Sequence, residues 1–319
     1  MNPILEIQNL NVKFKLTGRE ILAVRDVSFN LEKGKTLGLV GESGCGKSVT
    51  AFSILKLIQP PGIIDSGKII YNGKDIIPFP EDEIRKIRGK EIAIIFQEPM
   101  TSLNPVFKIG FQISETIKLH LNKTKSESKE LTYGMLKKVG IPNPEKRYNS
   151  YPHELSGGMR QRVMIAMSLS AYPSILIADE PTTALDVTIQ AQILDLLLNI
   201  QEENNMSLLL ISHDLGIIAN TADAIAIMYA GEIAEIGNVN KIFDNPLHPY
   251  TAGLFEAIPI IGQNRERLNT IPGVVPTITE KQESCSFYPR CSRRKNECLK
   301  GSIPLIEKEN SHLVRCIVE

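Results

Sequence analysis

The sequence lacks an excess of charge of either sign. Its 319 residues include 36 lysines and arginines and 36 aspartates and glutamates, so the formal net charge at pH 7 is zero. Proteins that bind nucleic acids or anionic membranes broadly usually carry a basic excess or a basic stripe. Composition therefore gives no support to either class, although local charged patches are compatible with it.

Long apolar runs are also missing. Residues 1–6 hold no basic region in front of an apolar stretch, and the richest apolar runs, such as residues 208–211, are far shorter than a bilayer span. We also find no internal repeat and no low-complexity tract. With 42% hydrophobic residues, the chain can build the core of one large domain or two ordinary ones. We expect a cytoplasmic chain with no transmembrane helix.

Cysteine is scarce in most of the chain and concentrated at one end. Only Cys45 lies in the first 284 residues, whereas the last 35 hold Cys285, Cys291, Cys298 and Cys316. This distribution is more typical of a metal site in a reducing compartment than of a disulfide framework. The spacing lacks the C-x-x-C pairs of most zinc sites, yet four thiolates can ligate Zn²⁺ or an iron–sulfur cluster. Cluster, zinc, and free or disulfide-bonded thiols all remain open at this point.

The most specific motif is a glycine-rich segment at residues 41–48. It reads Gly41-Glu42-Ser43-Gly44-Cys45-Gly46-Lys47-Ser48 and matches the G-x-x-x-x-G-K-[ST] phosphate loop. An apolar strand is expected before it at residues 36–40 and a helix after it at residues 47–58, so backbone N–H groups and a helix N-terminus converge on an anion. Lys47 would neutralise the β- and γ-phosphates, and Ser48 would ligate Mg²⁺. The segment therefore predicts a nucleoside triphosphate site.

Two adjacent carboxylates follow a second apolar strand, expected at residues 175–178. Phosphoryl transfer to water needs an acidic ligand near Mg²⁺ and a base for the attacking water. Asp179 suits the metal and Glu180 suits the water. Either carboxylate alone would more often be a helix cap or a solvated loop residue, so their pairing with the phosphate loop carries the hypothesis of hydrolysis.

Hydrophobic patterning predicts an α/β fold. Residues 4–40 alternate as strands with a turn near Gly18, and short apolar strands are expected at residues 92–96, 175–178 and 208–212. Helical stretches such as residues 188–203 separate the later strands, which gives βαβ units and a parallel sheet. We place a helical subdomain at about 105–170, inside a nucleotide-binding domain at 1–237. Prolines break the chain after Gly237, so residues 238–319 form a small extension that holds the four cysteines.

Four further segments make residues 4 to about 237 resemble the nucleotide-binding subunit of ABC transporters. They are Phe96-Gln97-Glu98-Pro99, Leu155-Ser156-Gly157-Gly158-Met159-Arg160-Gln161, Ala184-Leu185-Asp186 and Ile211-Ser212-His213-Asp214. Together with the phosphate loop and the carboxylate pair, they follow the order and spacing of that family. The resemblance implies an ABC-type domain: a RecA-like parallel-sheet core with N-terminal antiparallel strands and a helical subdomain.

The resemblance also implies roles in ATP hydrolysis. Glu180 would polarise the attacking water, His213 would contact the γ-phosphate, and Asp186 would belong to the Asp loop. Mg²⁺ would be held by Ser48, Gln97 and Asp179, with Gln97 also contacting the water. The implied ATP-binding residues are Phe14, Gly41, Ser43, Gly44, Cys45, Gly46, Lys47, Ser48 and Val49. Phe14 falls where the family stacks an aromatic ring on adenine, and an ordinary half-buried strand position is an equally good interpretation of it.

The signature segment implies that one chain cannot complete a site. In the family, Ser156, Gly157, Gly158 and Met159 face the ATP bound to an opposing subunit. The glycines permit close backbone approach, and a helix beginning near Met159 would direct its positive end toward the γ-phosphate. Met159 replaces the commonest glutamine, a change that the peptide-importer branch tolerates. We therefore expect a homodimeric or heterodimeric sandwich.

The branch most similar to this chain is that of the dipeptide and oligopeptide importers, which also includes nickel importers. Residues 97–105, 248–254, 271–276 and 285–291 carry this likeness. It implies a peripheral subunit on the cytoplasmic face of the cell membrane, bound to permease subunits and serving an external peptide-binding protein. Dipeptide, oligopeptide and nickel remain open as substrates. A soluble ABC ATPase acting on nucleic acid or ribosomes is the alternative of another class, and the single phosphate loop and neutral charge speak against it.

The same resemblance implies a [4Fe–4S] cluster on Cys285, Cys291, Cys298 and Cys316, with zinc as the second candidate. A short segment broken by prolines buries little apolar surface, so an inorganic centre would serve to order it. Its distance in sequence from every catalytic motif argues against a direct part in hydrolysis.

Overall fold

The computed structural model describes residues 3–98, 102–183, 186–257, 270–280, 283–309 and 311–318. The chain forms two compact units, Met1–Pro78 with Leu210–Glu319 and Phe79–Leu209. Strand β8 (Ser207–Ser212), with every residue buried, is the point at which the chain returns from the second unit to the first. No helix in the part of the chain that the structure describes is long and apolar enough to cross a membrane.

The first unit begins with an antiparallel sheet. Its four strands are β1 (Leu5–Leu16), β2 (Arg19–Leu31), β4 (Gly62–Tyr71) and β5 (Lys74–Asp75), in the order β2-β1-β4-β5. Buried Leu5 and Ile7 alternate with half-buried neighbours along β1, the period of a strand with one face on a core. Gly18 makes the β1–β2 turn with a φ of +79°, a conformation that glycine adopts at little cost. The predicted N-terminal antiparallel strands are confirmed.

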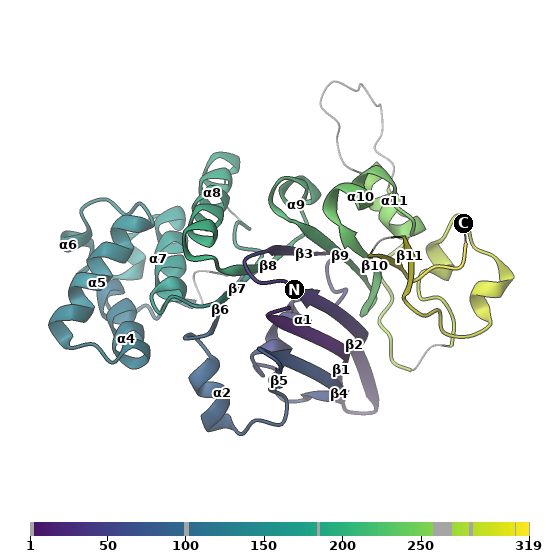
Figure 1. Cartoon of the computed structure of the whole chain (residues 1–319), viewed down its shortest axis with the longest axis horizontal. Coiled ribbons are helices and arrows are strands. Elements are labelled where there is room, and N and C mark those ends of the chain that lie inside the picture. The colour runs from purple at the N-terminus through teal and green to yellow at the C-terminus, as the bar shows by residue number, and fades with distance from the viewer. Residues whose placement is uncertain are drawn as a thin grey trace. The chain divides into compact units, whose positions relative to one another are not determined.

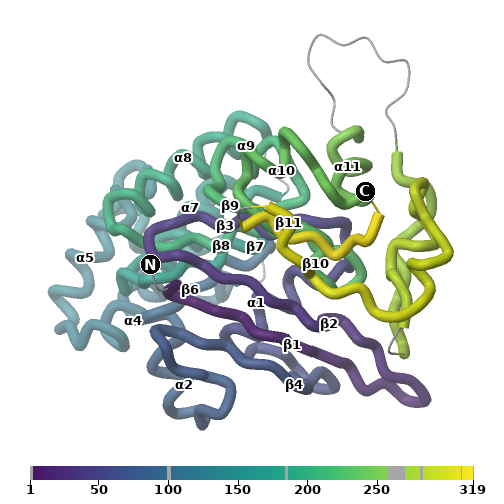
Figure 2. Tube along the Cα trace, turned by 45° about the vertical axis from the view of Figure 1, so that its right-hand side comes forward, coloured from purple at the N-terminus to yellow at the C-terminus, as the bar shows by residue number. Residues whose placement is uncertain are grey.

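A second group of strands in this unit includes the strand that leads into the phosphate loop. Strand β3 (Thr36–Val40) runs parallel to β9 (Ala224–Tyr229), and β10 (Glu232–Asn238) returns antiparallel to β9. The hairpin of β11 (Ile306–Glu309) and β12 (His312–Val314) continues from β10, so the C-terminal residues are part of the same sheet. Figure 2 shows this segment in yellow running along β10.

Short helices complete the first unit. They are α1 (Lys47–Ile54), α9 (Leu215–Thr221), α10 (Val239–Asp244), α11 (Pro249–Glu256) and the 3₁₀ turns η2 (Tyr288–Arg290) and η3 (Asn296–Leu299). Helix α1 ends earlier than the predicted residue 58. The reason is local: Lys56 adopts a left-handed φ of +50°, and the Leu57 N–H donates to the Phe52 carbonyl, which closes the helix before the prolines.

The second unit combines a parallel strand pair with most of the helices. Strands β6 (Ile92–Ile95) and β7 (Ile175–Asp179) pair in parallel, as predicted for these two segments. The helical elements are α2 (Glu81–Ile87), α4 (Ile109–Leu121), α5 (Lys125–Lys138), α6 (Pro144–Arg147), η1 (Pro152–Glu154), α7 (Gly157–Leu169) and α8 (Val187–Asn204). Figure 1 shows α4, α5, α6 and α7 gathered as a helical group. The α/β prediction is therefore confirmed.

The helical group is held by caps and buried hydroxyls as well as by apolar packing. A capping box formed by Thr124 and Glu127 begins α5. Between α4 and α5, the Ser114 hydroxyl lies 2.9 Å from that of Thr132 and 3.1 Å from that of Tyr148. These buried polar groups satisfy one another, so they fix the packing of the helices without leaving an unpaired donor there.

Candidate functional site

The phosphate loop in the first unit depends on two glycines. Gly46, at the N-cap of α1, has a φ of +108°, and a Cβ there would lie 2.5 Å from the Ala23 carbonyl oxygen. A Cβ on Gly41 would lie 2.2 Å from the Met228 carbonyl oxygen. Because the obstacles are backbone atoms, neither position can accept a larger residue without moving the loop.

Lys47 is folded back over the loop. Its Nζ donates to the carbonyl oxygens of Gly41 at 2.8 Å and Glu42 at 3.1 Å, and its side chain is buried. Ser43 and Gly44 are exposed, and Ser48 lies half-buried in the first turn of α1 with Val49. Exposed loop residues, a helix N-terminus and a buried ammonium group together suit a phosphate chain.

Two further predicted ATP-binding residues, Cys45 and Phe14, also make contacts within the fold. Cys45 is fully buried, and burial raises the pKa of its thiol, so the thiol stays protonated. Its backbone carbonyl accepts from the Gly231 N–H at 2.9 Å, which ties the loop to the β9–β10 turn. Phe14 is half-buried in β1 with Gly62 directly against its ring, a position that fits an ordinary strand residue as well as an adenine contact.

In the second unit, two predicted catalytic residues meet. Gln97 Nε2 donates to Glu180 Oε2 at 2.9 Å, and the Thr183 hydroxyl donates to the same oxygen at 3.0 Å. Glu180 follows buried Asp179 at the end of β7 and has a left-handed φ of +47°. Such a backbone is uncommon for a residue with a side chain, and strain of this kind clusters at functional sites. The structure thus holds the Glu180 carboxylate beside Gln97, at the point where the backbone leaves strand β7.

The remaining motif residues lie at helix N-termini. Ser156 caps α7 through a 3.4 Å bond from the Met159 N–H, so the helix begins at Gly157, close to the predicted start near Met159. Asp186 caps α8 by accepting from the Ile189 N–H at 2.9 Å. The exposed His213 directly precedes Asp214, which caps α9. The motif residues Pro99, Ala184 and Leu185 lie outside the described residues, as do Met100 and Thr101 of the segment after Gln97.

The four C-terminal cysteines lie near one another. Cys285 and Cys291 are half-buried, Cys298 and Cys316 are buried, and all four are free thiols. The pKa of Cys285 is raised to about 11, mainly by burial, and the neighbouring Cys298, Cys316 and Cys291 contribute to this rise. The Cys285 N–H also donates to the Cys298 carbonyl at 2.9 Å. Among the residues that the structure describes, no three His, Cys, Asp or Glu side chains are placed to hold one metal ion.

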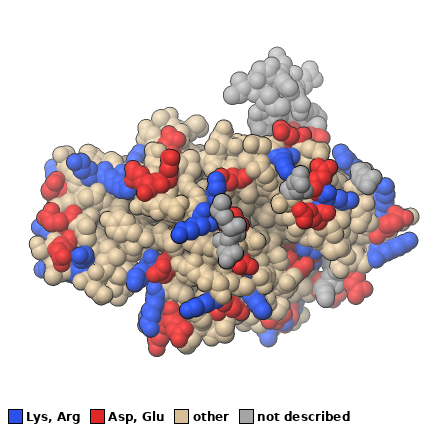
Figure 3. Space-filling view, viewed as in Figure 1, with Lys and Arg blue, Asp and Glu red and all other residues tan. Residues whose placement is uncertain are grey.

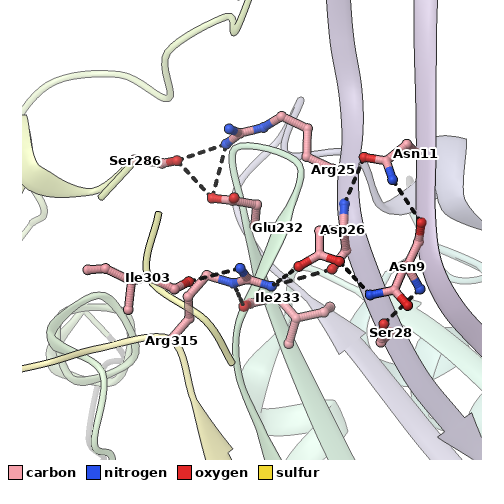
Figure 4. A network of polar contacts seen from close by, with 10 residues as sticks. All are labelled: Asn9, Asn11, Arg25, Asp26, Ser28, Glu232, Ile233, Ser286, Ile303 and Arg315. Atoms are coloured by element: carbon pink, nitrogen blue, oxygen red, sulfur yellow. Dashed lines mark hydrogen bonds and ion pairs between the residues drawn. The ribbon is translucent and has the colours of Figure 1, made fainter. Parts of the chain in front are cut away.

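A polar network anchors this C-terminal segment to β2 and β10 (Figure 4). Arg25 Nη2 donates to Ser286 Oγ at 2.8 Å and pairs with Glu232 at 3.1 Å, and Ser286 Oγ donates to the same carboxylate at 2.8 Å. Arg315 Nη2 pairs with Asp26 at 3.2 Å. Both arginines are at most 9% exposed, and the pair of Arg25 with Glu232 is the better shielded one because the Asp26 side chain is 50% exposed.

Two residues that are not among the predicted site residues link the cysteine segment to the phosphate loop. Arg290, directly before Cys291, forms a bidentate pair with Glu42, the second residue of the loop, at 3.0 and 3.1 Å. Their 248-residue separation leaves no local pattern that would have paired them. Although the segment is far from the catalytic motifs in sequence, it therefore contacts the phosphate loop in the fold.

Comparison with known proteins places these features in context. A family model described as "ABC transporter" matches residues 24–183, and one described as "Oligopeptide/dipeptide transporter, C-terminal region" matches residues 234–298. The oligopeptide transport ATP-binding protein OppD of Bacillus subtilis is 49% identical over 314 residues, which cover 98% of this chain and 88% of that protein. A putative peptide import ATP-binding protein of Brucella ovis is 48% identical, with 99% and 97% covered.

Solved structures agree at the level of the fold. The ATP-binding cassette MJ0796, solved as a dimer in a post-hydrolysis state bound to ADP and Pi, matches with a TM-score of 0.67 and 25% identity. The match covers 74% of this chain and 98% of that one. CbiO1 of Clostridium perfringens, part of the ABC transporter complex cbiONQ, matches with a TM-score of 0.66 and 26% identity over 77% and 92% of the two chains.

Proposed function

Because the chain belongs to the ABC transporter family, as an ATP-hydrolysing subunit of the peptide-importer type, we propose that it drives the import of dipeptides or oligopeptides through a partner permease. The observation that carries this proposal is identity of 48–49% over nearly the whole chain with proteins named for oligopeptide transport and peptide import. The match of the C-terminal region at residues 234–298 to the oligopeptide/dipeptide model supports it independently of the nucleotide motifs.

ATP and Mg²⁺ are the ligands that this family membership implies. We propose that Lys47 and the N–H groups of the phosphate loop bind the phosphates and that Ser48, Gln97 and Asp179 hold Mg²⁺. The buried Lys47 ammonium and the exposed loop residues support the first part. When bound, the metal would offset phosphate charge and polarise the γ-phosphoryl group.

Glu180 is proposed as the base that polarises the attacking water, with His213 contacting the γ-phosphate. The bonds from Gln97 and Thr183 support this role because they hold the Glu180 carboxylate in one orientation beside Gln97. Ser156, Gly157, Gly158 and Met159 are proposed to complete the site of an opposing subunit, and Asp186 to lie in the Asp loop. A second ATP-binding subunit, identical or different, is then a required partner.

The partners and location follow from the proposed transport role. We place the chain on the cytoplasmic face of the cell membrane, bound to permease subunits that receive peptide from an external binding protein. Charged side chains of both signs are interspersed on the face drawn in Figure 3, which gives no support to nucleic acid as a partner.

The proposal of a membrane partner is tested by purifying the tagged chain from native membranes after mild crosslinking. We expect permease subunits and a second ATP-binding subunit to co-purify. A complex with ribosomes or DNA, and no membrane protein, would instead favour the soluble ABC ATPase. A nickel importer would be distinguished by its permease and by the substrate that it transports.

We further propose that the four C-terminal cysteines hold a [4Fe–4S] cluster. The donor set fits: four free thiols lie within electrostatic reach of one another, on a segment fixed by buried arginines. Thiolates that share one Zn²⁺ at 2.3 Å would have sulfur atoms about 3.8 Å apart, whereas in a cluster each thiolate binds its own iron at a wider spacing. The described part of the chain holds no three candidate ligands placed around one ion, so the support for the cluster is the donor set and the peptide-importer resemblance.

The cluster proposal predicts the metal content of anaerobically purified protein. We expect about four iron and four sulfide per chain and a broad absorption near 400 nm, both lost in Cys298→Ser. The Cys45→Ala variant is the matched control, since it removes the fifth cysteine and should keep the iron. One zinc per chain without iron would contradict the cluster and support the zinc alternative.

A further inference from the structure

The contact between Arg290 and Glu42 joins the cysteine segment to the phosphate loop by two parallel hydrogen bonds. Arg290 Nη1 donates to Glu42 Oε1 at 3.0 Å, and Nη2 donates to Oε2 at 3.1 Å. The Arg290 side chain is only 6% exposed and that of Glu42 28%. A bidentate pair shielded in this way is stronger and more specific in direction than a surface ion pair.

Arg290 is itself held in place before it reaches Glu42. Its Nε donates to the Pro272 carbonyl at 2.8 Å, and Nη2 lies 3.3 Å from the Ile271 carbonyl. The guanidinium group also sits 5.7 Å from the centre of the Tyr229 ring. These contacts fix the plane of the guanidinium group, so it presents its donors to Glu42 without further loss of side-chain freedom.

Glu42 is held at its backbone as well. Its N–H donates to the Tyr250 hydroxyl at 3.0 Å. Tyr250 is fully buried, and its ring packs 5.4 Å from that of Phe287, which lies in the cysteine segment. The Glu42 carbonyl accepts from Lys47 Nζ, so Glu42 also contacts the ammonium group that is proposed to bind phosphate. Glu42 therefore connects the cysteine segment with the phosphate-binding lysine.

Two physical effects give this connection a role in nucleotide binding. First, a loop that is already ordered loses less conformational freedom when ATP binds. Second, the Glu42 carboxylate is a negative charge in a loop that must accept a triphosphate, and Arg290 offsets that charge. Loss of Arg290 would make the loop less ordered and would also leave the Glu42 carboxylate to repel the triphosphate.

We propose that Arg290 is a positioning residue for the phosphate loop, so that the folded cysteine segment sets the affinity of the chain for ATP. This inference rests on the proposed function, that the loop binds ATP. It assigns a task in nucleotide binding to a segment that lies outside the nucleotide motifs in sequence.

The test is the Kd of the full chain for Mg-ATP by titration calorimetry. Arg290→Met should raise the Kd about tenfold, the change that about 1.4 kcal/mol produces. Adding Glu42→Gln should restore most of the affinity, because it removes the repulsive charge. Arg290→Lys keeps a charge but loses the fork, so its Kd should lie between those of Arg290→Met and the wild type. The exposed Arg293→Met is the matched control and should bind as the wild type does.

In the assembled transporter, the same Arg290→Met change should raise the KM for ATP and leave kcat within about twofold, the pattern expected for lost binding without lost catalysis. Wild-type affinity in Arg290→Met or Arg290→Lys would overturn the inference. So would weak binding that Glu42→Gln fails to relieve, because a purely structural loss does not depend on residue 42. A wild-type chain that binds no ATP would instead contradict the proposed function.

Discussion

Replacing Glu180 with glutamine is expected to lower ATP turnover by about 10²–10⁴-fold, the range for loss of a positioned base, while ATP binding persists. Glutamine has the same shape, and its side-chain oxygen can still accept from Gln97 and Thr183 as Glu180 does at 2.9 and 3.0 Å. The change therefore removes basicity and leaves the geometry. Steady-state hydrolysis by the assembled complex checks the loss of turnover, and ATP binding measured on the same preparation checks that binding persists.

The matched control is Glu202→Gln, an exposed glutamate on α8. It should hydrolyse ATP at the wild-type rate. If Glu180→Gln also retained near-normal turnover, the base would have to be another residue. A variant that lost ATP binding along with turnover would point to a structural role for Glu180 instead.

Replacing Gly157 with glutamate should lower the rate of ATP hydrolysis by the assembled transporter roughly 10²-fold or more. This is the range for loss of one contact that stabilises a transition state. A Cβ at Gly157 meets no atom of its own chain within 4 Å, and the residue is exposed at the first turn of α7. An acidic residue there favours the helix N-terminus, so the isolated chain should fold and bind ATP normally. The loss would arise from repulsion of the ATP on the opposing subunit.

Gly134→Glu provides the control, because Gly134 is also exposed on a helix and its Cβ also meets nothing within 4 Å. It should leave hydrolysis unchanged. Full activity of Gly157→Glu in the assembled transporter would contradict the shared site. The same conclusion would follow if a chain shown to be monomeric hydrolysed ATP at the rate of the complete transporter.

The sequence was most informative where local chemistry decides structure. The phosphate loop had to follow a buried strand and open a helix, and β3 and α1 lie where that rule puts them. Buried strands β6, β7 and β8 were predictable because short apolar runs are bounded by polar turns. Periodicity and turn residues were sufficient to predict these elements, without the spacing of the motifs.

Other elements depend on distant partners that periodicity does not record. The hairpin of β11 and β12 forms because β12 pairs with β10. The many prolines in this part of the sequence predicted short irregular pieces and not strands. The contact of Gln97 with Glu180 joins two loops 83 residues apart, and the pairing of Arg290 with Glu42 spans 248. Each residue is chemically ordinary by itself. Its role depends on which charge or carbonyl the fold brings to it.

The most direct test of the central claim is coupled transport in proteoliposomes that contain the complete transporter, with ATP on the side of this chain and the binding protein on the other. We predict that labelled oligopeptide accumulates only while ATP is hydrolysed, and that Glu180→Gln abolishes both uptake and hydrolysis. Nickel supplied in place of peptide should not accumulate. Uptake of nickel without peptide, or peptide uptake that continues in Glu180→Gln, would contradict the account.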